Sequence, residues 1–114
     1  MYWKVGGAIL SVLVLTTGGC FSAPRGTPDV SSPDPSLKIQ GIAKAVSEKD
    51  RVKAQQMVID LNNDDAAVRF YAIEGLQRLT GETFGYRYYD DEDQRRPAIK
   101  RWNDWMKEQE IAKK

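Results

Sequence analysis

The sequence predicts an all-α protein in which four short helices follow an N-terminal signal or anchor helix and a linker rich in proline and serine. Apolar residues recur three and four positions apart in successive segments, which is the spacing of one face of a helix. No segment alternates apolar and polar residues over the length of a strand. Because the connections between the predicted helices are short, we expect consecutive helices to be antiparallel.

The N-terminal end has the layout of an export signal, which we assign to residues 1–19. Lys4 supplies a positive charge, residues 5–15 form an apolar core, and residues 16–19 are small or polar. This core is shorter than the ~20 apolar residues that a helix needs to cross a bilayer. The alternative is an uncleaved transmembrane helix, because residues 5–24 contain no charge.

The position of Cys20 after Gly18 and Gly19 resembles the lipobox of bacterial lipoproteins. The resemblance implies that Cys20 becomes the first residue of the mature chain, with a diacylglycerol on its sulfur and a fatty acid such as palmitate on its amine. Thr17 is a departure, because that family usually has Leu at this position. Phe21 stands where Asp would disfavour the outer membrane in bacteria that sort by this position. We therefore expect a lipid-anchored protein on the periplasmic face of the bacterial cell envelope, with the outer membrane favoured.

Residues 20–36 are predicted to form a tether. Most of the prolines and several serines of the chain lie here, and such a composition cannot bury a core, so we expect a disordered and partly extended segment. At ~3.1 Å per residue, this segment would reach up to ~50 Å from the membrane. The folded domain is then expected over residues 37–114.

The predicted helices of this domain have recognisable ends. The first helix is expected to begin with Asp34 as its N-cap and Pro35 as its first residue. Residues 62–65 are predicted to form a turn rich in capping side chains, and Gly81 is predicted to end the third helix. Pro97 fits only near the start of the last helix, which runs from about 92 to 111. The apolar faces are Ile39, Ile42, Ala43 and Val46; Ala54, Met57, Val58 and Leu61; Val68, Ala72, Leu76 and Leu79; and Ala98, Trp102, Trp105 and Met106. Val52 and Ile59 give the second helix a second, narrower apolar side. Phe70 and Ile73 give the third helix a second apolar side, so we expect the third helix to lie between two neighbours.

The stretch DLNNDDAAVRFYAIEGLQRLTG, residues 60–81, resembles a HEAT-type helical repeat. The matching residues are Leu61, Asp64, Asp65, Val68, Arg69, Ala72, Leu76 and Leu79. The resemblance implies that Asp65 (or Asp64) and Arg69 pack between repeats and satisfy backbone groups. Residues 37–61 fit the same helical hairpin more loosely, and residues 81–105 look like the C-terminal end of small exported HEAT-like proteins. The resemblance implies a binding scaffold of about two hairpins and no enzyme.

Six aromatic residues lie close together near the C-terminus: Phe84, Tyr86, Tyr88, Tyr89, Trp102 and Trp105. Solenoids usually need three or more repeats, so a short one must close its ends in another way. We expect Phe84 and Trp102 to pack onto the third helix, near Leu76 and Leu79, as an aromatic cap. The alternative is a binding surface, since Tyr and Trp dominate protein interfaces, and Tyr88 and Tyr89 are then the exposed members.

Composition excludes several chemistries. The chain has no His and one Cys, which removes imidazole catalysis, zinc sites built from cysteine pairs, and disulfide frameworks. Lys and Arg balance Asp and Glu from Cys20 onward, which disfavours nucleic acid, and we expect no cofactor and no metal. We expect the acidic run over 90–93 to favour the start of the last helix rather than bind calcium. Arg95, Arg96, Lys100 and Arg101 are expected to be a solvated face rather than a phosphate or lipid-headgroup site.

Three functions are compatible with these observations. The first is a membrane-tethered, non-enzymatic HEAT-like adaptor that binds a protein partner in the envelope. The second is an accessory subunit of a membrane complex, held by an uncleaved N-terminal helix. The third is a small hydrolase that uses carboxylates such as Glu74, Glu82 and Asp104.

Overall fold

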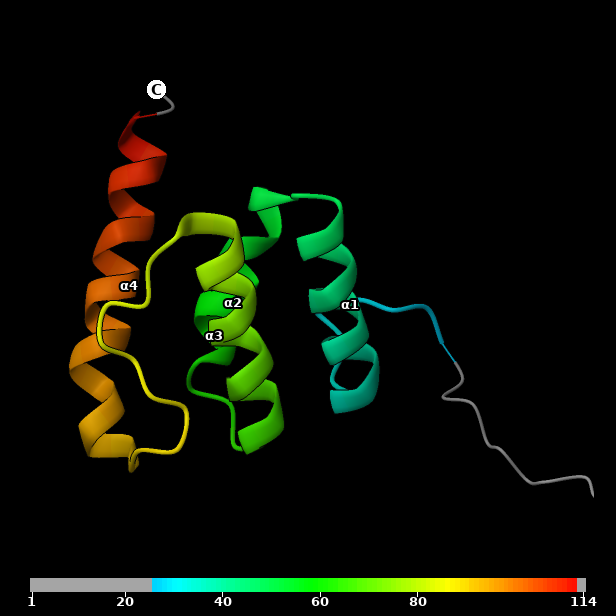
Figure 1. Ribbon diagram of the computed structural model, residues 1–114, viewed down its shortest axis with the longest axis horizontal. Coiled ribbons are helices and arrows are strands. Elements are labelled where there is room, and N and C mark those ends of the chain that lie inside the picture. Colours follow the sequence, from blue (N-terminus) through cyan, green and yellow to red (C-terminus); the bar gives the residue numbers. More distant parts are fainter. Residues whose placement is uncertain (1–25, 113–114) are drawn as a thin grey trace, which may run out of the picture.

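The computed structural model describes residues 26–112, and this part of the chain is helical with no strand. It contains α1 (Pro35–Ser47), the short 3-10 helix η1 (Arg51–Lys53), α2 (Ala54–Asp60), α3 (Ala66–Thr80) and α4 (Glu92–Ala112). The predicted all-α class is therefore confirmed (Figure 1). The predicted signal segment and Cys20 lie outside the described residues.

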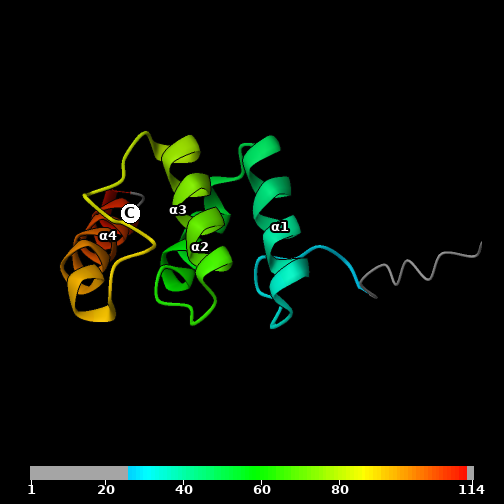
Figure 2. The same cartoon turned by 60° about the horizontal axis from the view of Figure 1, so that its bottom comes forward.

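The helices lie in two layers. α1 packs on α3, α3 packs on α2, and α2 packs on α4. Figure 2 shows α1 and α3 side by side in one layer, with α2 and α4 in the other. α1 and α2 run in opposite directions, as predicted for consecutive helices, and α1 packs mainly on α3. The expectation that α3 lies between two neighbours is confirmed.

The direction of α4 differs from the prediction. Figure 1 shows that α1, α2 and α3 alternate in direction, whereas α4 runs parallel to α3. The loop between α3 and α4 spans residues 81–91 and returns along the whole bundle. A loop of this length can extend over more than 30 Å at ~3.3 Å per residue, whereas α3 is only ~22 Å long at ~1.5 Å per residue. The loop therefore reaches the starting end of α3 before α4 begins.

Local sequence signals set the helix ends. The Asp34 carboxylate accepts hydrogen bonds from the amides of Ser36 and Leu37, with Pro35 in the first turn of α1. Gly81 ends α3 with a left-handed φ of 81°, a conformation that glycine adopts without strain. These three predicted signals are confirmed. Pro97 lies in the second turn of α4. A proline usually stands in the first turn of a helix, so α4 begins one turn earlier than the position of Pro97 predicts.

The folded domain begins before the predicted boundary at residue 37. Val30 is only 4 % exposed and belongs to the core. The amide of Asp29 donates a hydrogen bond to the carbonyl of Leu37 at 3.2 Å. A Cβ on Gly41 would lie 2.4 Å from the backbone of Asp29 and Val30, so only glycine lets this segment lie so close to α1.

The core is continuous from Val30 to Trp102. On α1 the buried face is rotated from the predicted one: Ala43 is exposed, while Ala45 is buried, because the N-terminal segment covers a further side of the helix. A Cβ on Gly75 would meet Ile42 Cγ2 at 2.9 Å and Met57 Sδ at 3.0 Å. Gly75 therefore sets the close crossing of α1 and α3. The largest fully buried side chains are Trp102, Ile42, Met57, Leu61, Leu76 and Val68.

Candidate functional site

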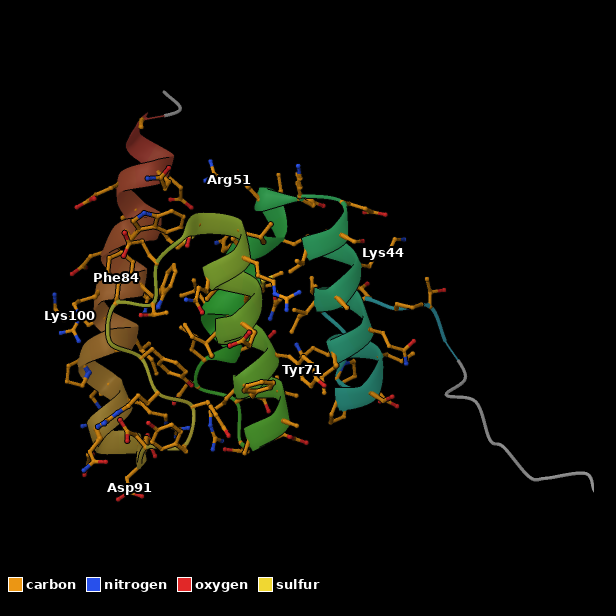
Figure 3. The ribbon with its side chains drawn as sticks, in the orientation of Figure 1. Lys44, Arg51, Tyr71, Phe84, Asp91 and Lys100 are labelled. Atoms are coloured by element: carbon orange, nitrogen blue, oxygen red, sulfur yellow. The ribbon has the colours of Figure 1, made fainter. Side chains whose placement is uncertain are left out.

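The aromatic residues near the C-terminus form two groups, of which the first is a buried cluster. Trp102 is 0 % exposed, and its indole Nε1 donates a hydrogen bond to the carbonyl of Thr83 at 3.0 Å. Its ring makes edge-to-face contacts with Phe84 and Trp105, at centroid distances of 4.7 and 5.5 Å. Phe84 and Trp105 pack against the same core and are partly exposed. This group, with Tyr86, occupies the α4 end of the bundle (Figure 3).

Tyr86 connects the returning loop to the α2 layer. Its hydroxyl donates a hydrogen bond to the carbonyl of Leu61, just after α2, at 2.6 Å. Burial raises the pKa of Tyr86, and the positive charges of Arg95 and Arg69 partly offset that effect. Phe84 reaches its place through a left-handed φ of 53°, a strained conformation for a residue with a side chain. The loop is therefore held by a buried ring and a specific hydrogen bond.

Asp65 and Arg69 both bind backbone groups. The Asp65 carboxylate accepts hydrogen bonds from the amides of Ala67 and Val68 and so caps α3. Arg69 donates from Nη1 to the carbonyls of Asn63 and Asp64, and from Nε to the carbonyl of Tyr88 at 3.0 Å.

Arg69 thereby joins two distant parts of the chain, the turn before α3 and the loop before α4. The loop carbonyl that it contacts lies 19 residues away. The backbone contacts of Arg69 therefore help to place the Tyr88 region beside the start of α3.

The second aromatic group is exposed, and we call it the aromatic ladder: Tyr71, Phe70, Tyr88 and Tyr89. Consecutive rings make edge-to-face contacts at centroid distances of 5.2, 5.1 and 5.3 Å. Phe70, Tyr71 and Tyr89 are 36 %, 42 % and 66 % exposed, and Tyr88 is half-buried. Phe70 and Tyr71 were not singled out by the sequence analysis as site residues. No sequence signal shows that the loop carries Tyr88 back against Phe70.

A groove between α1 and α3 continues the aromatic ladder. Its volume is about 320 Å³ and its lining is mainly apolar. Figure 3 shows Tyr71 on the side of α3 that faces α1. Glu74 and Arg78 are the charged residues that line it. The remaining lining residues are Ile42, Ala43, Val46, Ser47, Phe70 and Gly75.

A buried ion pair, which the sequence analysis missed, joins three segments. Lys38 Nζ lies 2.9 Å from Asp60 Oδ1 and donates a second hydrogen bond to the carbonyl of Val30 at 2.8 Å. The two side chains are only 8 % and 3 % exposed. Burial raises the pKa of Asp60, and the hydrogen bond from Lys38 opposes that effect. Asp60 Oδ2 has no hydrogen-bond partner among the residues that the structure describes.

The charged segments around α4 are mostly on the surface. Arg96 pairs with Asp93 at 3.0 Å, and Lys100 pairs with Asp104 at 2.8 Å, within the same helix. Asp93 and Glu92 lie in the first turn of α4, where negative charge is favourable. The residues expected to share a solvated basic face are Arg95, Arg96, Lys100 and Arg101.

Arg95 is the exception, and the expectation for it is wrong. Its side chain is buried, at 8 % exposure, and Nε and Nη1 lack a partner within the described part of the chain. Arg101 bonds the carbonyl of Phe84 through Nε at 3.0 Å, so it supports the loop.

The candidate hydrolase carboxylates lie on different elements. Glu74 lines the groove between α1 and α3, Glu82 lies in the loop, and Asp104 is paired with Lys100 on α4. The hydrogen bond from Lys100 lowers the pKa of Asp104. Residues 26–112 hold no group of three or more His, Cys, Asp or Glu side chains arranged to bind a metal.

Comparison with known proteins gives no relative: no family model, no curated protein and no solved structure matches the chain. Among the helices that the structure describes, none combines the length and the apolar character needed to cross a bilayer.

Proposed function

We propose that the chain is a membrane-tethered, non-enzymatic module for protein–protein interaction, a HEAT-like adaptor of the bacterial cell envelope. Cys20, carrying a diacylglycerol and a fatty acid, holds it to the membrane, and the helical domain binds an exported protein. The lipobox-like position of the lone Cys supports the anchor. The two-layered helical domain, with Asp65 and Arg69 bound to backbone groups, supports the scaffold.

The recognition surface in this proposal is the aromatic ladder together with the groove between α1 and α3. The observation that carries it is the continuous contact of four rings that remain partly exposed. Tyr and Phe rings offer a large contact area at a low cost in side-chain entropy, which is why aromatic residues are frequent at the centre of interfaces. The neighbouring groove would take apolar side chains of the partner, and Glu74 and Arg78 would pair with charges on its rim.

Crosslinking in native envelopes tests the recognition surface. A partner captured by the wild-type chain should be lost with Phe70→Ser plus Tyr71→Ser. Lys107→Ser plus Glu108→Ser is the control, because it changes two exposed side chains of α4 that line neither the aromatic ladder nor the groove. Equal capture by both variants would contradict the assignment of the surface.

Cys20→Ala tests the anchor separately. Acyl labelling and the shift to a smaller mature chain should disappear. Unchanged processing and unchanged mobility on a gel would instead support an uncleaved membrane helix, as in an accessory subunit.

A further inference from the structure

The α2 layer carries a second exposed apolar surface, which we call the α2 patch. Val52 and Ile59 are 75 % and 60 % exposed, more than most apolar side chains of this domain. Both line one shallow hollow of about 340 Å³, together with Gln55, Gln56 and Lys53. This patch lies on the opposite layer from α3, which carries two rings of the aromatic ladder (Figure 2).

The N-terminal segment runs along the edge of the α2 patch. Residues 29–31 line the same hollow. Lys38 and Asp60 fix this segment, because the Lys38 ammonium binds the Val30 carbonyl and the Asp60 carboxylate at once. Residues 29–31 are therefore held beside α2, and the chain continues from them past α1 to Gly26, which lies against Leu37 (Figure 1).

The length of chain between the domain and the anchor is short. Five residues lie between Cys20 and Gly26, where the described residues begin, so the two are six peptide steps apart. At a maximum of ~3.5 Å per residue they span ~20 Å. An acylated Cys20 would thus keep the domain, with residues 29–31 at the edge of the α2 patch, close to the bilayer at an effective concentration in the millimolar range. Even a weak contact of two apolar side chains becomes populated under that condition.

We propose that the α2 patch rests on the lipid bilayer, with Val52 and Ile59 in the headgroup region, so that the aromatic ladder faces away from the membrane. This orientation rests on the proposed lipid anchor at Cys20. One cation, Lys53, and one anion, Asp29, line the hollow, so their charges balance. The contact is therefore with the apolar part of the interface and does not require anionic lipids.

Two single-cysteine probes test the orientation. Acylation occupies the sulfur of Cys20, the chain's only natural cysteine, so an added cysteine is the single free thiol. Gln55→Cys places an environment-sensitive fluorophore on the α2 patch, and Gln77→Cys places it on the exposed side of α3. Each labelled full-length product is reconstituted into phosphatidylcholine vesicles that contain brominated lipids, which quench fluorophores at membrane depth.

We expect the Gln55 probe to be quenched severalfold more than the Gln77 probe, and to lose that difference when Val52→Ser and Ile59→Ser are added. Equal quenching at both positions, in an acylated chain that floats with the vesicles, overturns the orientation alone. A blue shift at position 55 without quenching by brominated lipids means that a protein covers the patch, and also overturns it. A chain whose intact mass lacks the acyl groups overturns the anchor, and the orientation with it.

Discussion

Lys38→Met tests whether the buried ion pair determines the stability of the domain. The substitution keeps the length of the side chain but leaves the Asp60 carboxylate buried at 3 % exposure without its cation. Removing one partner of a buried pair typically costs ~3–5 kcal/mol, because the remaining charge keeps its desolvation penalty. The Val30 carbonyl also loses its hydrogen bond from Lys38. We expect a loss of this size in the free energy of unfolding, measured with urea by circular dichroism.

The double variant Lys38→Met plus Asp60→Leu separates the pair from general packing. It removes both charges together, so it should recover most of the loss, since apolar replacement of a whole buried pair is often neutral or stabilising by ~1–4 kcal/mol. A Lys38→Met loss below ~1 kcal/mol, the range of exposed pairs, would refute the reasoning. So would a double variant that is as unstable as the single one.

The pH dependence gives an independent check on Asp60. Burial raises its pKa in the folded state. A group with a raised folded pKa contributes stability that is present below its unfolded pKa and is lost as the pH rises through the folded pKa. Lys38→Met removes an interaction that lowers the pKa of Asp60. The stability that this variant loses relative to the wild type should therefore shrink as the pH falls from neutral toward the ordinary pKa of an aspartate. A stability difference between the variant and the wild type that stays constant or grows on acidification would contradict this role of Asp60.

Three further substitutions test the packing. Trp102→Ala should destabilise the domain by ~3–5 kcal/mol, because a fully buried indole leaves a cavity, whereas Trp105→Ala should cost clearly less in the same thermal melt. Gly75→Ala should cost ~1–3 kcal/mol by forcing α1 and α3 apart, and wild-type stability would show that the crossing can adjust. Tyr86→Phe should lower the free energy of unfolding by ~1–3 kcal/mol, because it leaves the buried Leu61 carbonyl without a hydrogen bond. Tyr89→Phe, at an exposed ring, is the control and should leave the free energy of unfolding unchanged.

Local signals allowed much of the secondary structure to be predicted. The Asp34 and Asp65 caps and the Gly81 stop act within a few residues of the helix ends that they define. The apolar spacing of the second helix also survives, since Ala54, Met57, Val58 and Leu61 are all buried. Such features depend on backbone groups and neighbours in sequence, so the order of residues specifies them directly.

The candidate sites were harder to predict because they depend on contacts between distant segments. The aromatic ladder exists only because the returning loop brings Tyr88 to Phe70, 18 positions earlier in the chain. Arg95 was expected on a solvated face, and the packing of α4 buries it. Lys38 gave no signal at all in the sequence, since a lysine on a short helix is most often exposed.

The order of residues by itself determined that this domain is helical and where most of its helices start and stop. It also determined that a single cysteine stands before the domain, ahead of a short proline-rich segment. Only the tertiary structure decided that α4 runs parallel to α3, that residues 29–31 lie beside α2, and that two exposed apolar surfaces lie on opposite layers. The reason is physical: a cap or a turn is satisfied within a few residues, whereas the choice of which faces meet is made by the burial of the whole core at once.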